Sequence, residues 1–166
     1  SRFNEQTVRT MGRNATGVRA MRIDEGDEVS GMVSVCNPEK DTVLVVSDQG
    51  YGKRSDVEDY RITNRGGKGV KTMNITDKTG KLVALKVVND EDDLMIINVS
   101  GITLRLHTSD IRVMGRATQG VRLINLSKRG DTIASICRVP REDEENINAE
   151  TSEATTEDSD HPENDN

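Results

Sequence analysis

Three times the chain runs through a glycine turn flanked by cations: Gly12-Arg13-Asn14-Ala15-Thr16-Gly17-Val18-Arg19, Asn64-Arg65-Gly66-Gly67-Lys68-Gly69-Val70-Lys71 and Gly115-Arg116-Ala117-Thr118-Gln119-Gly120-Val121-Arg122. Gly69 follows Gly17 by 52 residues, and Gly120 follows Gly69 by 51. A period near 50 residues is typical of a stack of similar supersecondary units. The repeat therefore indicates both the architecture and the kind of partner that the surface suits.

Short apolar runs recur in register between these turns. Residues 43–46 align with residues 94–97, and each repeat closes with a further apolar segment, over residues 29–35, 82–88 and 133–139. Runs that are this short and rich in β-branched residues predict strands, and the four-residue runs predict strands buried on both faces. We find no helical periodicity. The sequence therefore predicts an all-β fold of about four strands per unit, as in the blades of a propeller.

Charge divides the chain into two regions. The whole chain has 166 residues and a net charge of −6, yet residues 140–166 contain 11 acidic residues and one basic residue. The preceding residues hold 18 acidic and 22 basic residues, a net charge of +4. Acidic segments with so little apolar surface are typically disordered. We predict blades over residues 1–140 and an acidic disordered tail over residues 141–166.

Other residue patterns narrow the class of protein. Cys36 and Cys137 fall at different phases of the repeat, which indicates free thiols in a reducing compartment. No apolar run approaches the length of a membrane span, and the first residues do not resemble a signal peptide, so we expect a cytoplasmic protein. The two histidines, His107 and His161, have no partners at a metal-binding or catalytic spacing. We therefore expect no metal, no cofactor and no active site in this chain.

Four cationic positions recur in every repeat. They are Arg2, Arg54 and Arg105; Arg9, Arg61 and Arg112; Arg13, Arg65 and Arg116; and Arg19, Lys71 and Arg122. A solvated strand face would explain any one of them, but four positions kept in three repeats favour a basic band around one surface of the blades. Lys53 and Lys68 lie beside these positions and are predicted to contribute. Such a band suits a regularly charged polyanion, and double-stranded DNA fits that description.

The remaining residues suggest how DNA would be bound. The glycines of residues 65–69 would let a phosphate approach backbone N–H groups, with Arg65 and Lys68 beside it. For the isolated glycines, a turn conformation is the simpler explanation. One Phe, two Tyr and no Trp cannot supply stacking platforms for single strands. We predict contact with the duplex backbone that is weakly specific, strongly salt-dependent and tolerant of bending.

Residues 8–19, 50–54 and 113–121 resemble the C-terminal domain of the bacterial DNA gyrase A subunit, over roughly residues 1–140. The resemblance implies a β-pinwheel, a propeller-like disc of six blades that exchange outer strands, of which this chain would hold about the last three. It also implies that duplex DNA wraps around the basic rim, so that the whole enzyme introduces negative supercoils on ATP hydrolysis. The hallmark heptapeptide Gln-Arg-Arg-Gly-Gly-Lys-Gly of the first blade is absent, and residues 64–69 are its nearest echo.

The same resemblance implies binding partners, and two other classes of protein remain as alternatives. The partners would be the rest of the gyrase A subunit and the gyrase B subunit in an A2B2 holoenzyme associated with the nucleoid, which uses ATP and Mg elsewhere. One alternative is the C-terminal domain of the A-type subunit of topoisomerase IV, although the full motifs favour gyrase. Another is a propeller that serves as a protein-interaction platform, with the arginines as a solvated rim. The acidic tail would either compete with DNA for the basic rim or act only as a solubilising segment.

Overall fold

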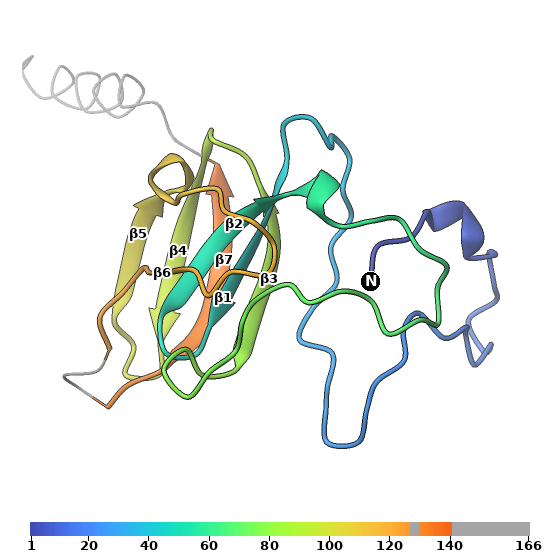
Figure 1. Cartoon of the computed structure of the whole chain (residues 1–166), viewed down its shortest axis with the longest axis horizontal. Helices are drawn as coiled ribbons and strands as arrows, with labels where there is room; N and C mark the ends of the chain where they lie inside the picture. The colour runs from blue at the N-terminus through green and yellow to red at the C-terminus, as the bar shows by residue number, and fades with distance from the viewer. Residues whose placement is uncertain (127–129, 141–166) are drawn as a thin grey trace, which may run out of the picture.

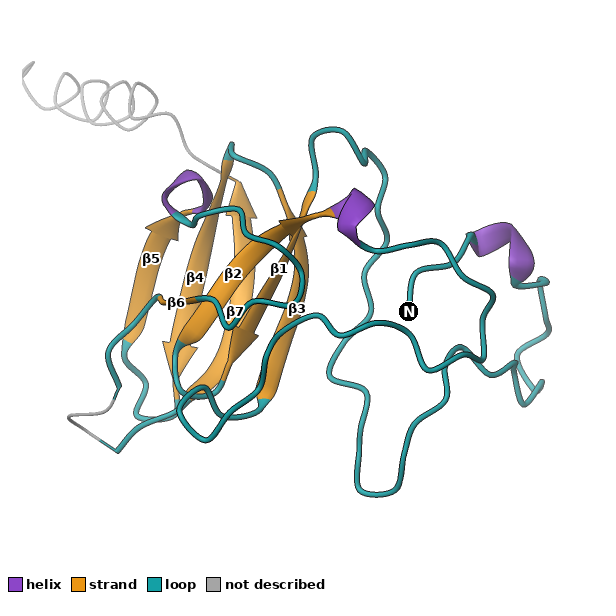
Figure 2. Cartoon of the chain, viewed as in Figure 1, coloured by secondary structure: helices purple, strands orange, loops and turns teal. Residues whose placement is uncertain are grey.

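The computed structural model describes residues 1–126 and 130–140, so the predicted tail over residues 141–166 lies outside the described residues. Three 3-10 helices occupy equivalent points of the three repeats, and no α-helix occurs in the described ranges (Figure 2). The strands are β1 Thr42–Ser47, β2 Tyr51–Asp56, β3 Leu82–Val88, β4 Asp92–Asn98, β5 Thr103–His107, β6 Val121–Arg122 and β7 Ile133–Pro140. The 3-10 helices are Glu5–Thr7, Val57–Asp59 and Thr108–Asp110. The all-β prediction is confirmed.

The strands form two antiparallel sheets, with the orders β3-β1-β2-β6 and β5-β4-β7 (Figure 1). Strand β6 belongs to the third repeat by sequence, yet it pairs with β2 of the second repeat, with Tyr51 opposite Arg122 and Gly52 opposite Val121. Gly120 permits this approach because its φ is +83° and a Cβ there would lie 2.7 Å from the Gly52 carbonyl oxygen. Neighbouring repeats therefore exchange an outer strand, as the resemblance implies.

Strand β1 is buried on both faces, as predicted. Val43 and Val45 point into a cluster with Tyr51, Val57 and Met73. Leu44 and Val46 point into the larger core that joins the two sheets, and the other buried residues of that core are Ala84, Val88, Leu94, Ile96, Ile111, Leu126, Ile133 and Ile136. Burial of a side chain of this size contributes about 1.5–3 kcal/mol. Packing of one sheet on the other therefore stabilises the junction between the second and third repeats.

The prediction of a closing strand over residues 29–35 is wrong. In the second and third repeats the closing strands β3 and β7 pair with the opening strands β1 and β4. Residues 1–41 contain no counterpart of those opening strands, so the backbone of residues 29–35 has no ladder to join. The segment instead lies along β3, where Ser30 Oγ donates to the Leu82 carbonyl at 3.2 Å.

Candidate nucleic-acid interface

The glycine turn over residues 65–69 is held against the first repeat by main-chain hydrogen bonds. The Arg22 N–H donates to the Gly67 carbonyl at 2.9 Å, and the Gly66 N–H donates to the Ala20 carbonyl at 2.8 Å. This turn is therefore part of the junction between repeats. The Gly66 N–H, one of the groups predicted to bind a phosphate, therefore already donates a hydrogen bond within the protein.

Arg2 and Arg54 fasten each repeat to the next. Arg2 Nη1 donates to the Tyr60 carbonyl at 3.1 Å, and Arg54 Nε donates to the Ile111 carbonyl at 2.8 Å. Tyr60 and Ile111 both follow the 3-10 helix of their repeat, so the same bond is made at both junctions. Arg54 is buried and Arg2 is half-buried. These two arginines recur because they join repeats, and the structure does not place them on an open basic rim.

Arg65 and Arg116 fasten in the opposite direction, from a repeat to the one before it. Arg65 Nε donates to the Thr7 carbonyl at 3.0 Å, and Arg116 Nε donates to the Asp59 carbonyl at 3.2 Å. Arg116 also bonds to the Lys71 carbonyl. Both arginines are half-buried, so each joins two repeats while part of its surface still faces solvent.

Lys53 is completely buried in β2 rather than on the surface. Its Nζ donates to Ser55 Oγ at 3.0 Å and to the Gly115 carbonyl at 2.8 Å, and it also bonds to the Arg116 carbonyl. Burial lowers the pKa of Lys53 to about 8, because the charged ammonium loses its hydration. This side chain holds the third glycine turn against β2 and leaves no donor for a phosphate.

Arg105, the third-repeat counterpart of Arg2 and Arg54, lies on β5 and binds a carboxylate. Its Nε donates to Asp93 Oδ2 at 2.7 Å, and His107 Nδ1 lies 2.7 Å from Asp93 Oδ1. The hydrogen bond with His107, and then that with Arg105, holds the pKa of Asp93 below its usual range. Arg105 was predicted to bind DNA, but Asp93 neutralises part of its charge.

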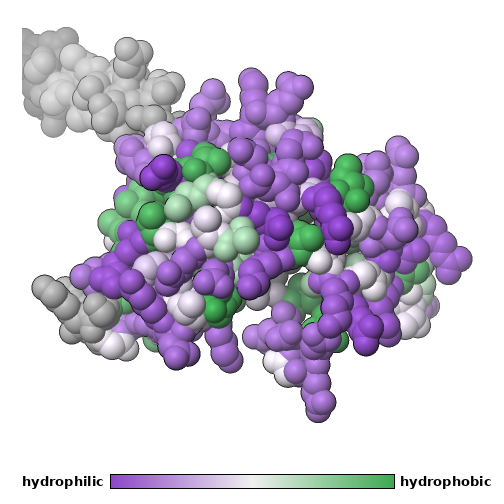
Figure 3. Space-filling view, viewed as in Figure 1, coloured by the Kyte–Doolittle hydropathy of each residue, from purple (hydrophilic) through white to green (hydrophobic). Residues whose placement is uncertain are grey.

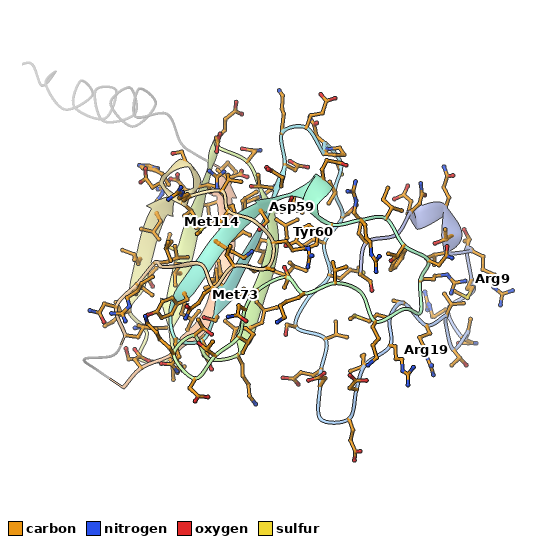
Figure 4. The ribbon with its side chains drawn as sticks, in the orientation of Figure 1. Arg9, Arg19, Asp59, Tyr60, Met73 and Met114 are labelled. Atoms are coloured by element: carbon orange, nitrogen blue, oxygen red, sulfur yellow. The ribbon has the colours of Figure 1, made fainter. Side chains whose placement is uncertain are left out.

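The other predicted cations face solvent. Arg122 donates to the Tyr51 hydroxyl at 2.9 Å. Lys68 Nζ lies 3.4 Å from Asp24 Oδ2, and this ion pair is weak because both side chains are exposed to solvent. Figure 4 shows Arg9 and Arg19 on the N-terminal segment, at the outer edge of the molecule. Six exposed side chains make no hydrogen bond or ion pair with another described residue: Arg9, Arg13, Arg19, Arg61, Lys71 and Arg112. These six form the open part of the candidate interface.

Sequence reasoning missed two residues beside Arg122. Tyr51 receives the Arg122 hydrogen bond, and Lys78 Nζ lies 5.6 Å from the centre of the Tyr51 ring. Nothing in the repeat pointed to Lys78, because it lies in a turn outside the four recurring positions. Lys78 and Arg122 both lie beside the Tyr51 ring, and only the strand exchange brings Arg122 there.

Other kinds of site receive no support from the described ranges. Within them, no group of three or more His, Cys, Asp or Glu side chains could hold a metal ion. Cys36 and Cys137 are free thiols, as predicted, and the structure places both at the surface. No helix within the described ranges is long and apolar enough to cross a membrane.

The stacked antiparallel sheets, the exchanged outer strand and the recurring arginine bonds define a propeller-like array of blades. The chain belongs to the family described as DNA gyrase C-terminal domain, beta-propeller, whose model matches residues 2–36, 41–89 and 92–139. The resemblance found in the sequence is thereby confirmed.

Relatives and solved structures agree with this assignment. The chain is 45% identical over 157 residues to the DNA gyrase A subunit of Staphylococcus aureus strain NCTC 8325, covering 93% of this chain and 17% of that protein. A structure titled DNA gyrase A C-terminal domain superposes with a TM-score of 0.71 and 27% identity, over 82% of this chain and 45% of that one. The C-terminal domain of DNA topoisomerase IV gives a TM-score of 0.77 at 21% identity, over 92% and 47%, which shows a shared fold.

Proposed function

We propose that this chain is a DNA-wrapping module of the DNA gyrase A subunit, which binds and bends duplex DNA on its exposed cations. Family membership supports the proposal, and the observation that carries it is the set of six exposed cations that pair with no other described residue. Arg61 and Arg112 follow equivalent 3-10 helices in successive blades, and Arg9 occupies the corresponding place in the first repeat. Equivalent positions in stacked blades present charge at regular intervals, which suits a phosphate backbone.

The proposed contact surface is narrower than the full set of recurring cations. It comprises Arg9, Arg13, Arg19, Arg61, Lys71, Arg112 and Arg122, with Lys68 and the exposed parts of Arg65 and Arg116 beside them. Arg2, Lys53 and Arg54 act as fasteners between blades, and Arg105 is paired with Asp93. DNA is thus bound through side chains that the stack leaves open.

The two tyrosines favour duplex over single-stranded DNA. Tyr51 is 7% exposed and packs in the core. Tyr60 is half-buried, and its hydroxyl lies 2.6 Å from Thr72 Oγ1. Neither ring is free to stack on a base, so binding relies on backbone charge.

The same proposal extends to the assembly. The module would act with the rest of the gyrase A subunit and with the gyrase B subunit in an A2B2 holoenzyme, in the cytoplasm and near the nucleoid. ATP and Mg would be used elsewhere in that holoenzyme, and this chain would contribute binding rather than catalysis. The identity of 45% to a gyrase A subunit supports gyrase over topoisomerase IV.

A protein-interaction platform is the rival from another class. Figure 3 shows mostly hydrophilic side chains on the face in view, with apolar side chains in small separate groups. Protein-binding surfaces more often expose a contiguous apolar patch. The face in view therefore favours a charged partner.

Titration of the chain with a duplex at several salt concentrations tests the proposal. Each phosphate contact contributes a slope of about −0.9 to log K against log salt, so we expect a slope steeper than about −2. A duplex labelled with a donor and an acceptor at its two ends should show increased energy transfer on binding. A slope near zero would overturn the proposal of DNA binding, and unchanged energy transfer would overturn the bending.

A further inference from the structure

Two cations converge on one tyrosine where the second and third repeats exchange a strand. Arg122 Nη2 donates to the Tyr51 hydroxyl at 2.9 Å, and its Cζ lies 5.4 Å from the centre of the Tyr51 ring. Lys78 Nζ lies 5.6 Å from the same centre. Tyr51 comes from β2, Arg122 from the exchanged strand β6, and Lys78 from the turn that precedes β3.

All three side chains are carried on hydrogen-bonded backbone. The Tyr51 ring is fixed in the core beside Val43 and Val45, and the β2–β6 ladder places Arg122 directly opposite it. The turn that bears Lys78 is closed by buried Thr79, whose Oγ1 accepts from the Thr76 N–H at 2.8 Å. The cluster is therefore organised before any ligand arrives.

The charge of this cluster is not neutralised within the described residues. Arg2, Arg54, Lys68, Arg105 and Arg138 each pair with a carboxylate there, whereas Lys78 and Arg122 do not. Asp77 directly precedes Lys78, and Asp48 precedes Tyr51 by three residues. Among the ion pairs of the described residues, neither carboxylate pairs with Lys78 or Arg122.

The hydrogen-bonding groups of the cluster are mostly donors. The Tyr51 oxygen accepts from Arg122, which leaves its O–H to donate, and Lys78 and Arg122 can only donate. The Arg122 hydrogen bond lowers the pKa of Tyr51, and Lys78 adds to this effect, as expected in a positive field. A ligand that fits must bring negative charge and accept several hydrogen bonds.

We propose that Lys78 and Arg122, with the Tyr51 hydroxyl, bind a backbone phosphate of duplex DNA at the junction between the second and third repeats. This site rests on the proposed function and adds a contact outside the recurring register, because the residue equivalent to Tyr51 in the third repeat is Ile102. Tyr51 acts mainly as a positioning residue for Arg122. The site forms only when β6 is exchanged, so it ties DNA contact to correct assembly of the two blades.

The test compares K78Q with K81Q in the full chain. Lys81 is exposed and lies three residues away, outside the cluster around Tyr51, so K81Q removes the same charge from the same segment. We expect the salt slope to become less steep by about 0.9 in K78Q and to stay unchanged in K81Q. Y51F, which keeps the ring but loses the hydroxyl, should weaken binding at low salt by less than K78Q does.

The outcomes separate this site from the proposed function. If the unmodified chain shows no salt-dependent binding, the proposed function fails and the site fails with it. If the unmodified chain binds with a clearly negative slope and K78Q matches K81Q, only the site is overturned. Thermal unfolding of both variants shows whether they are folded to the same extent, and neither change removes a contact that holds the core.

Discussion

Replacement of Lys53 by methionine tests whether this side chain joins two repeats or contacts DNA. Lys53 Nζ makes hydrogen bonds to Ser55, Gly115 and Arg116 while it is completely buried. Methionine keeps the volume and loses all three bonds. Hydrogen bonds to charged groups are worth about 1.5–3 kcal/mol each, but water can reach the exposed Gly115 and removal of a buried charge offsets part of the loss. We expect K53M to lower the free energy of unfolding by about 2–4 kcal/mol at pH 7.

The loss of stability in K53M should also depend on pH and should increase as the pH rises. Because burial lowers the pKa of Lys53 to about 8, the unfolded chain binds more protons than the folded chain above that pH. The stability that Lys53 contributes is therefore fully present above its unfolded pKa and partly lost as pH falls through about 8. The difference between the unmodified chain and K53M should grow from about pH 7.5 to about pH 10.

Urea unfolding at several pH values, followed by circular dichroism, measures both effects, and the DNA salt slope is measured on the same samples. We expect the unfolding midpoint to fall and the salt slope to remain that of the unmodified chain. An unchanged midpoint together with a slope less steep by about 0.9 would contradict this role of Lys53, because Lys53 would then contact phosphate instead of joining repeats.

Two further predictions concern the sheet junction and acid stability. G120A should destabilise the fold by about 1–3 kcal/mol or more, because alanine is strained at a φ of +83° and its Cβ would clash with the Gly52 carbonyl oxygen. G17A is the matched control, because Gly17 also has a positive φ but a Cβ there meets nothing within 4 Å. Denaturant unfolding of the two variants measures the difference in stability. For Asp93, hydrogen bonds with His107 and Arg105 lower the pKa, so its stabilising effect is present above the unfolded pKa and lost as pH falls through the lower folded value. The stability difference between the unmodified chain and D93N should therefore shrink below about pH 4, and an unchanged difference at about pH 3 would contradict this.

The sequence predicted the parts of the fold that depend on local pattern. Residues 43–46 alternate between two apolar surroundings, and their β-branched composition was enough to indicate a strand buried on both faces. Residues 29–35 also carry apolar side chains, at positions 29, 32, 33 and 35, but form no strand. A strand requires a partner for its backbone, and no feature of the segment itself reveals whether that partner is present.

The candidate site was only partly predictable, for a different reason. Repetition shows that a position has the same environment in each copy, but it does not show whether that environment is solvent or the next repeat. Arg54 and Arg61 recur equally well, yet one bonds to the Ile111 carbonyl and the other is exposed. The contact between Tyr51 and Arg122 spans 71 residues and depends on strand exchange, so no local spacing could indicate it.

The most direct test of DNA binding through the exposed recurring cations compares two double variants in the full chain. R61Q/R112Q removes two exposed cations from equivalent blade positions, and K40Q/K81Q removes two exposed cations from turns outside the register. If the exposed recurring cations contact phosphates, the DNA salt slope becomes less steep by about 1.8 in the first variant and is unchanged in the second. Equal slopes for the two variants would contradict it, because binding would then follow net charge alone.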